Sequence, residues 1–504
     1  MTSLVEHPRR LHVVDPITGE SRADYDIADE AAVHAAVERA RDAAGWWAGL
    51  RARERRRHLS AYKSLIASRI DELAELIRAE TGKSLAGAQL EVMLAVEHLD
   101  WAARNARRVL KRRSVSSGML AFNQASSVTY VPFGVVGVIG PWNYPVYTPM
   151  GAVSHALAAG NAVVFKPSEF TPGVGVWLAQ CWSELLPDQP VLQVVTGDGA
   201  TGAALCRAAV DKIAFTGSAA TGRAVMAACA ERLTPVVIEG GGKDALIVTA
   251  DADLDAAAQA AVFGGLGNAG QTCAGVERVY VEQAVYEPFV ARLAELARKV
   301  RPGAEPEAPY GPMTTPTQPG IVLRHITDAI DRGARALVGD AASVRPPFVE
   351  PVVLTDVPED SAAVTDETFG PVLVVNPVVD AEEALRRTNA TAYGLSGAIF
   401  TRHRRRGLAL AAQLRAGAVS VNSVLGYAGV PSLPFGGVGD SGFGRVHGAD
   451  GLREFSRPMS VTWQRFRPPI DLMTLQPAAS AMRTSLAMFR WRHGRSTHPA
   501  RRDA

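Results

Sequence analysis

The stretch KIAFTGSAATGR, Lys212–Arg223, joins a β-rich run directly to an Ala-rich helical pattern. The run ends at Thr216, and Gly217 and Ser218 form the turn between the two elements. Such a turn presents backbone amides and the positive end of a helix at the carboxyl edge of the strand, where a phosphate can bind. Ser218 is also suited to cap the helix. Taken alone, the segment fits an ordinary capped turn at least as well.

The same alternation of strand, turn and helix recurs on both sides of this stretch. Upstream are the runs GVVGVIG, NAVVFKPSE and VLQVVTG, and downstream are DALIVTAD, RVYVEQ and GAVSVNSV. Short β-branched runs followed by helical segments are typical of parallel βαβ units, whose ligand sites lie at the carboxyl ends of the strands. The sequence therefore predicts an α/β fold with two such series, and it predicts the seam between them near Glu239.

The flanking regions have a different character. The first third is strongly helical, with apolar residues at three- and four-residue spacing, and residues 114–131 alternate weakly, as in an exposed hairpin. From Arg457 onward the chain has nine arginines and two acidic residues, Asp471 and Asp503. This composition favours a solvated, partly disordered tail, with peripheral contact to an anionic surface as the alternative.

Composition excludes several classes of protein. The chain has 504 residues, 21% charged and 47% apolar, and Lys plus Arg exceeds Asp plus Glu by two (53 − 51). Two or more domains are expected at this length, and nothing indicates nucleic-acid binding. Because the N-terminus lacks the apolar core of a secretory signal, and no run of about 18 apolar residues occurs, we expect neither export nor a membrane span.

The four cysteines fit a reducing cytoplasm, since they are few, scattered and without a Cys-x-x-Cys pair. Cys181, Cys206 and Cys229 lie in helical, Ala-rich surroundings and read as buried hydrophobic residues. Cys273 lies instead among Gly, Asn, Gln and Thr in GNAGQTCAG. No pattern of metal ligands is present, so no metal site is predicted.

Two matches to the Gly-x-Gly-x-x-Gly dinucleotide fingerprint occur, GLGNAG at 265–270 and GVGDSG at 437–442. A true fingerprint must follow a strand and open a helix. The first follows the helical pattern DLDAAAQAAVFG, and no suitable strand precedes the second. Both matches are therefore interpreted as coincidental.

Three other residues suggest acyl-transfer chemistry. Asn143 lies between two prolines in GPWNYP, a rigid turn from which an amide can donate to an oxyanion. Glu239 ends a β-branched run before three glycines, where partial desolvation would raise its pKa toward that of a general base. The thiolate of Cys273 would need a polar, amide-rich setting to form near neutral pH. Together they comprise a nucleophile, a base and an oxyanion donor.

With these three residues, the chain resembles the NAD(P)-dependent aldehyde dehydrogenases. The resemblance runs nearly end to end, through the motifs DPITGE, AETGKS, GPWNYP, FKPSE, FTGSAATG, EGGGK, GNAGQTCAG, DETFGPV, YGLSGAIFT and PFGGVGDSGFGR. Glu239 and Cys273 are 34 residues apart (273 − 239), the spacing usual in that family.

The resemblance implies a covalent mechanism. Cys273 would attack the aldehyde carbonyl, and the Asn143 side chain and the Cys273 backbone amide would hold the oxyanion. Hydride would leave to the nicotinamide, and Glu239 would activate the water that hydrolyses the thioester to a carboxylate.

The resemblance also implies the cofactor, NAD with NADP as an alternative. Glu169 would accept from a ribose 2′-hydroxyl and repel a 2′-phosphate, although Lys166 could still serve a phosphate. The implied cofactor-binding residues are Ile139, Pro141, Trp142, Lys166, Ser168, Glu169, Phe215, Gly217, Ser218, Glu367 and Phe369.

The fold implied is a Rossmann-like coenzyme domain, an α/β catalytic domain and a small β extension that pairs between subunits. The boundaries are 1–113 and 132–240 for the coenzyme domain, 241–440 for the catalytic domain, 114–131 and 453–466 for the oligomerisation strands, and 467–504 for the basic tail. A cytoplasmic homodimer or homotetramer is therefore expected.

Three departures from the family pattern mark a divergent branch. Gly240 stands where most relatives have Leu, which suggests a looser backbone beside Glu239. Val446 replaces the Glu that often follows the last Gly-Arg, so a second proton-relay carboxylate is missing there. The GVGDSG motif also lacks the frequent Lys.

The substrate is predicted from two segments. Tyr144, Tyr147 and Met150 follow Asn143, and Val424, Leu425 and Tyr427 belong to a late loop that lines the entry funnel in relatives. This apolar to aromatic lining predicts a medium-chain aliphatic or aromatic aldehyde. The alternatives are a semialdehyde dehydrogenase, a CoA-acylating aldehyde dehydrogenase, a catalytically silent binding relative and a cofactor-free cysteine hydrolase.

Overall fold

A computed structural model describes residues 9–468, 472 and 474–494. The chain forms two compact units. The first contains the described residues up to Leu110 together with Val131–Arg457, and the second contains Lys111–Tyr130 and the described residues from Pro458 onward.

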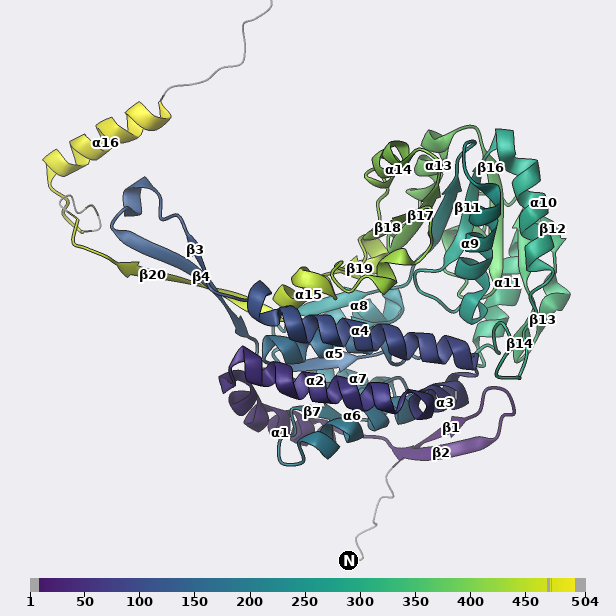
Figure 1. Cartoon of the computed structure of the whole chain (residues 1–504), viewed down its shortest axis with the longest axis horizontal. Coiled ribbons are helices and arrows are strands. Elements are labelled where there is room, and N and C mark those ends of the chain that lie inside the picture. Colours follow the sequence, from purple (N-terminus) through teal and green to yellow (C-terminus); the bar gives the residue numbers. More distant parts are fainter. Residues whose placement is uncertain (1–8, 469–471, 473, 495–504) are drawn as a thin grey trace, which may run out of the picture. The chain divides into compact units, whose positions relative to one another are not determined.

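The first unit begins with a short hairpin and four helices. The strands β1 (Arg10–Val14) and β2 (Ser21–Asp26) pair antiparallel, a hairpin that the sequence analysis did not predict because helical periodicity dominates this third of the chain. The predicted amphipathic helices are present as α1 (Glu30–Gly49), α2 (Ala52–Ser68), α3 (Ile70–Thr81) and α4 (Leu85–Val109). Helix α4 packs against both α2 and α5 (Figure 1).

A six-stranded sheet in the order β19-β9-β8-β5-β6-β7 follows. Its parallel strands are β5 (Val135–Ile139), β6 (Ala162–Lys166), β7 (Leu192–Val194), β8 (Lys212–Thr216) and β9 (Val236–Glu239). The helices between them are α5 (Tyr147–Ala159), α6 (Pro172–Leu185), α7 (Gly199–Arg207) and α8 (Ala219–Ala230). All pairings among β5 to β9 are parallel, as the alternating sequence predicts.

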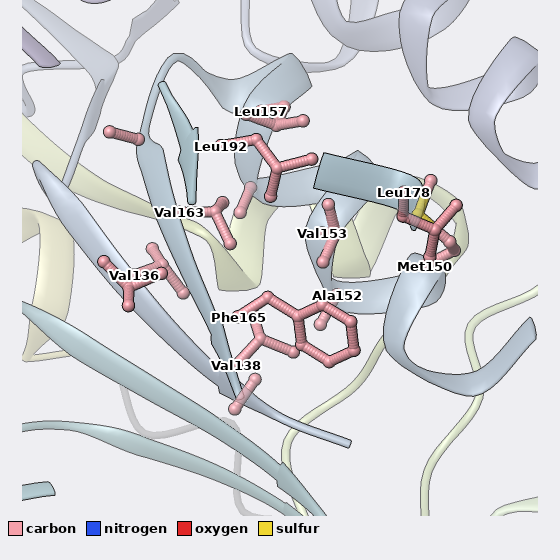
Figure 2. Packing of buried hydrophobic residues seen from close by; sticks show 14 of the residues in the cluster. Val136, Val138, Met150, Ala152, Val153, Leu157, Val163, Phe165, Leu178 and Leu192 are labelled. Atoms are coloured by element: carbon pink, nitrogen blue, oxygen red, sulfur yellow. The ribbon is translucent and has the colours of Figure 1, made fainter. Parts of the chain in front are cut away.

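The central strands of this sheet have side chains buried on both faces. In β5 and β6 every residue is buried, so these strands read as continuous apolar runs, as expected for a sheet covered on both sides. Figure 2 shows Val136, Val163 and Phe165 packed with Leu157 and Leu192 in this core. The rigid centre fixes the strand ends from which the site residues project.

A second, seven-stranded sheet in the order β12-β15-β16-β11-β10-β17-β18 has its own hydrophobic core. Its strands are β10 (Asp244–Val248), β11 (Val276–Glu282), β12 (Arg335–Val338), β15 (Val352–Thr355), β16 (Val372–Val378), β17 (Ser396–Phe400) and β18 (Ala418–Val421). Only β12, at the edge, pairs antiparallel. The sheet changes between β9 and β10, which is the seam predicted near Glu239.

The helices of this second part are α9 (Leu254–Leu266), α10 (Tyr286–Ala297), α11 (Gln318–Asp331), α12 (Ala362–Thr365), α13 (Ala381–Thr388) and α14 (Arg404–Ala411). A two-stranded antiparallel pair, β13 (Val344–Arg345) and β14 (Phe348–Val349), lies between α11 and α12 in the sequence. The chain then returns to the first sheet, where β19 (Gly442–Phe443) pairs antiparallel with β9, and α15 (Gly448–Glu454) packs on α4 and α5.

The second unit contains a three-stranded sheet in the order β20-β4-β3. The predicted hairpin over 114–131 corresponds to β3 (Arg113–Val115) and β4 (Gln124–Pro132), and β20 (Ser456–Gln464) lies within the predicted range 453–466. Within the tail, which was expected to be solvated and partly disordered, Ala479–His493 form the helix α16, none of whose residues is buried. Residues 495–504 lie outside the described part. No described helix is long and apolar enough to cross a membrane.

Candidate active site

Glu239 and Cys273 come together at the seam between the two sheets. Glu239 is the last residue of β9, and Cys273 lies between the single-turn helix η2 (Gly267–Gly270) and β11. The Sγ atom of Cys273 is 4.0 Å from Oε1 of Glu239, which is 5% exposed. Residues 34 positions apart therefore form a thiol and carboxylate pair at one point.

The surroundings of this pair shift both pKa values upward. Burial raises the pKa of Glu239 to about 7, as the sequence analysis expects for a strand-end carboxylate beside bare backbone. Loss of hydration and the carboxylates of Glu239 and Glu367 raise the pKa of the Cys273 thiol well above its ordinary value. The setting is thus not the amide-rich one that would favour a resting thiolate.

The loop before Cys273 has an unusual backbone. Asn268, Ala269 and Gly270 are all left-handed, with φ of 54°, 57° and 70°. A Cβ atom on Gly270 would lie 2.1 Å from the carbonyl oxygen of Gly370, so only glycine allows this approach. Gly265 belongs to the helix α9 and packs against Leu373. The glycines of this motif therefore shape the cysteine loop and do not form a strand-to-helix phosphate turn.

Asn143 faces the same loop, and a buried ion pair holds its backbone in place. Its Nδ2 atom donates to the carbonyl oxygen of Gln271 at 3.0 Å, and its own carbonyl accepts from the buried ammonium of Lys83 at 2.8 Å. Lys83 also pairs with Glu91 at 2.6 Å, and Glu91 accepts from the backbone amide of Val146 at 2.7 Å. This buried ion pair fixes the GPWNYP turn.

The predicted coenzyme residues lie along one edge of the first sheet. Ile139 of β5 is in register with Lys166 of β6 and with Phe215 of β8, so the carboxyl ends of three strands coincide. Pro141 and Trp142 continue from β5 into the GPWNYP turn. At this edge the backbone amide of Gly217 donates to the carbonyl oxygen of Glu239 at 3.1 Å, which ties the glycine turn to the end of β9 that carries the carboxylate.

The two polar clusters at this edge suit the adenosine half of a dinucleotide. Oε2 of Glu169 is 3.5 Å from Nζ of Lys166 and accepts from Ser168 at 3.3 Å, which places a cation beside a hydroxyl acceptor. Ser218 is exposed and caps α8 by accepting from the amide of Thr221 at 3.2 Å. The capped helix end favours an anion such as a pyrophosphate.

Glu367 and Phe369 reach the edge from the second sheet. The ring of Phe369 meets that of Trp142 edge to face, with centroids 5.5 Å apart. Glu367 accepts from the amide of Gly242 at 3.0 Å, and loss of hydration raises its pKa to about 8. The structure thus brings together residues that the sequence separates by more than two hundred positions.

A buried ion pair anchors this loop. Lys243 bonds Glu277, and both side chains are almost fully buried. Glu277 also accepts from the amides of Thr368 at 2.9 Å and Phe369 at 3.1 Å, and Lys243 donates to Oγ1 of Thr368 at 3.0 Å. Phe369 has φ of 51°, so the loop needs these contacts to hold a left-handed aromatic residue.

Replacing Glu277 by glutamine is expected to destabilise the protein by about 3 kcal/mol, because it leaves the buried Lys243 ammonium without its counter-charge. Unfolding by urea at pH 7 measures the loss. The matched control is Glu295→Gln, which breaks an ion pair with the exposed Lys299 and should change little. Equal shifts of the two unfolding midpoints would contradict the structural role of the buried pair.

Two departures noted in the sequence are coupled in space. A Cβ atom on Gly240 would lie 2.6 Å from the carbonyl oxygen of Asp440, so the backbone of the GVGDSG motif occupies the space of a side chain at 240. Gly240 donates to the carbonyl of Ser441 at 3.0 Å, and the Ser441 hydroxyl donates to Gly241 at 2.6 Å. The expectation of a looser backbone beside Glu239 is therefore not met. These contacts clamp it.

Val446 is buried and exchanges backbone hydrogen bonds of 2.8 Å with Phe435. Met150, assigned to the substrate funnel from sequence, is 2% exposed and belongs to the core of the first sheet, as Figure 2 shows. Its assignment was wrong because helix α5 is buried around nearly its whole circumference. Within the described residues, no group of three or more His, Cys, Asp or Glu is arranged to hold a metal ion.

The sequence analysis missed the supporting ion pairs. Lys83 was noticed only as part of AETGKS and Lys243 only as part of EGGGK, and Glu91 lies in the helix α4. A possible signal for Glu91 was its position on the buried face of α4, among Ala88 and Val92. Charged residues on an apolar face are costly unless they are paired.

The fold and site define an α/β enzyme with a cysteine and a buried glutamate at the ligand-binding edge of a doubly wound sheet. The chain belongs to the aldehyde dehydrogenase family, whose sequence profile matches residues 4–461. It is accordingly an oxidoreductase that acts on aldehydes with a nicotinamide coenzyme.

Several known proteins are similar to it over nearly their whole length. A Methylomonas protein named 4,4'-diapolycopene aldehyde oxidase is 40% identical over 91% of this chain and 87% of its own. A Mycolicibacterium smegmatis protein with the provisional name succinate-semialdehyde dehydrogenase [NADP(+)] is 36% identical over 91% and 90%. The crystal structure of an NAD-dependent aldehyde dehydrogenase from Sinorhizobium meliloti superposes with a TM-score of 0.88 at 34% identity, covering 92% and 93%.

Proposed function

We propose that the protein oxidises an apolar aldehyde to a carboxylic acid through a covalent adduct on Cys273. The observation that carries this proposal is the thiol of Cys273 lying 4.0 Å from the buried carboxylate of Glu239. Burial raises the pKa of Glu239 to about 7, which suits a general base for the hydrolytic water, and the thiol of Cys273 loses its proton to solvent as sulfur attacks the carbonyl carbon.

The Asn143 side chain is suited to the oxyanion of the resulting thiohemiacetal. One amide hydrogen of Nδ2 is directed to Gln271, and the amide group has a second hydrogen to donate. The Lys83–Glu91 pair holds the turn, so the donor needs no reorganisation when charge develops on the substrate oxygen. The backbone amide of Cys273 is the second donor in this proposal.

NAD(P)+, when bound, supplies the acceptor for the hydride that leaves as the thiohemiacetal becomes a thioester. Glu239 then accepts a proton from water, the hydroxide attacks the thioester carbonyl, and the Cys273 sulfur leaves as the carboxylic acid forms. The coenzyme would be held by residues at this edge, namely Lys166, Glu169, Gly217, Ser218, Glu367 and Phe369, with Ile139, Pro141, Trp142, Ser168 and Phe215. Because the carboxylate of Glu169 opposes a 2′-phosphate, we expect NAD to be preferred over NADP.

The substrate is an apolar, aliphatic or aromatic aldehyde. Tyr144, Tyr147 and Tyr427 surround Cys273 closely enough that its thiolate would raise the pKa of each phenol. Lys83, which lies 4.1 Å from the centre of the Tyr144 ring, is neutralised by Glu91 and cannot bind a substrate carboxylate. The aldehyde in the name of the Methylomonas relative also fits an apolar substrate.

A semialdehyde is the second candidate, because the 36% identical relative has a succinate-semialdehyde name. Among the lining residues named above, none carries a free positive charge for a second substrate carboxylate, since Lys83 is paired with Glu91, and this disfavours a semialdehyde.

We also infer a cytoplasmic homodimer or homotetramer. The strand β20 lies at the edge of its sheet and is exposed along most of its length. An exposed edge strand of this kind is suited to pair with another subunit.

A panel of aldehydes assayed with NAD and NADP in parallel tests the proposal. We expect octanal and benzaldehyde to exceed succinic semialdehyde at least about tenfold in kcat/KM, since burying each extra CH₂ contributes about 0.8 kcal/mol. NAD should exceed NADP with each aldehyde. A wide preference for succinic semialdehyde would contradict the substrate class, and the absence of NADH with every aldehyde would favour a silent relative.

A further inference from the structure

Helix α16 (Ala479–His493) exposes its large apolar side chains. None of its residues is buried. Met482 is 37% exposed, Leu486 43%, Phe489 45% and Trp491 71%. A helix of this length is marginal in water by itself, and most helices gain their stability by burying an apolar face. The described chain provides no such burial for α16, so another surface must provide it.

The apolar residues form a stripe along the helix. Met482, Leu486, Phe489 and His493 follow a spacing of four, three and four residues, which places them on one face. The rings of Phe489 and His493 are in contact, with centroids 4.8 Å apart. Trp491 lies on the opposite face, about 180° from Met482 at 100° per residue.

Basic residues flank this stripe on both sides. At 100° per residue, Arg483 and Arg490 lie about 100° and 80° from Met482 in one direction, and Arg492 lies about 80° away in the other. Residues 472–502 contain six arginines and no acidic residue or lysine. Because the whole chain has a formal net charge of +2, the rest of the chain carries −4 (2 − 6). The positive charge is thus concentrated in this part of the sequence, and three of these arginines belong to α16 itself.

We propose that α16 lies on the surface of an anionic lipid bilayer, with Met482, Leu486 and Phe489 among the acyl chains and the flanking arginines at the headgroups. An apolar stripe bordered by arginines is the pattern of an interfacial helix. Juxtaposed phospholipid headgroups neutralise the arginines, and lipid chains supply the burial that the helix lacks.

A second copy of this chain is the other occupant to consider, and charge disfavours it. Two copies of α16 packed by their stripes would bring Arg483, Arg490 and Arg492 of both copies together without any acid in the helix to pair them. The inference does not depend on the substrate proposed above. A bilayer that holds apolar aldehydes would, however, keep substrate close to the enzyme.

Vesicle sedimentation with the full-length protein tests the proposal. The protein is mixed with vesicles of phosphatidylcholine alone or of phosphatidylcholine and phosphatidylglycerol at about 0.1 M salt. We expect at least about tenfold stronger binding to the anionic vesicles, and loss of that binding at about 1 M salt, where charges are screened.

Two variants with the same change in charge separate the contribution of the apolar stripe to vesicle binding from the contribution of net charge. Phe489→Glu should weaken binding about tenfold or more, whereas Trp491→Glu on the opposite face should weaken it no more than about threefold. Oxidation of a water-soluble aldehyde should be unchanged in both, which shows that they are folded and separates this inference from the proposed activity.

Four outcomes overturn the proposal. The first is equal binding to neutral and anionic vesicles, and the second is equal loss in both variants. The third is self-association without vesicles that Phe489→Glu abolishes in sedimentation velocity, which would assign the stripe to a second copy. Tight binding to duplex DNA that neither variant weakens more than the other would assign the arginines to nucleic acid and also overturn it.

Discussion

Cys273→Ala is expected to lower kcat/KM by about 10⁴-fold or more, because the nucleophile that forms both covalent intermediates is lost. The variant should still bind coenzyme, since Lys166, Glu169 and Ser218 lie on other strands and turns of the site. Formation of NADH measures the activity, and the shift of the thermal midpoint on adding NAD measures the binding.

Cys206→Ala is the matched control. Cys206 is fully buried in α7, so its replacement removes a similar thiol without touching the seam. We expect kcat to stay within about threefold of the unmodified protein. Substantial activity in Cys273→Ala, with intact response to NAD, would remove Cys273 from its proposed role.

Glu239→Gln is expected to reduce steady-state turnover by about 10² to 10⁴-fold, the usual contribution of a general base. If Glu239 acts in hydrolysis, the first turnover should survive as a burst of NADH close to one per subunit, because the thioester forms but is not hydrolysed. Hydroxylamine, which attacks thioesters without a base, should restore turnover. Loss of the burst together with turnover would instead assign Glu239 to thiol activation.

The pH dependence provides an independent readout of the same residue. Burial raises the pKa of Glu239 to about 7, and the carboxylate accepts protons only when it is ionised. Turnover of the unmodified protein should therefore rise as the pH increases through about 7, and this rise should be absent in Glu239→Gln. Acceleration by CoA beyond the rate with water would indicate the acylating alternative.

Much of the fold follows from local pattern. The runs GVVGVIG, NAVVFK and KIAFT became β5, β6 and β8, and their parallel pairing follows from the helices between them. The hairpin β1–β2 was missed because its two short strands have little apolar alternation to distinguish them from a polar loop. The helix α16 was not predicted within the tail, because composition alone does not distinguish an exposed helix from a solvated chain.

The residues of the site also divide into those that local sequence indicates and those that only packing decides. Asn143, Glu239 and Cys273 could be proposed as site residues from the sequence because each lies at a strand end or in a turn or glycine-rich loop with a recognisable motif. The ion pair Lys243–Glu277 could not, because it joins segments 34 residues apart that only packing brings together. The pair Lys83–Glu91 is local, eight residues apart, but its burial is decided by packing. Met150 was misassigned for the same reason, since proximity in sequence to Asn143 does not decide which way a helix faces.

The sequence by itself determined which elements form and which residues lie at their ends, because turns, caps and strand ends are set by residues within a few positions of each other. Only the tertiary structure decided the pKa values of these residues and the contacts that hold their backbone. The raised pKa values of Glu239 and Cys273 depend on water being excluded by elements distant in the sequence. The close contact between Gly240 and the backbone of Asp440 depends on the same packing of distant segments. Desolvation is a property of the packed site, and no local stretch of the chain contains it.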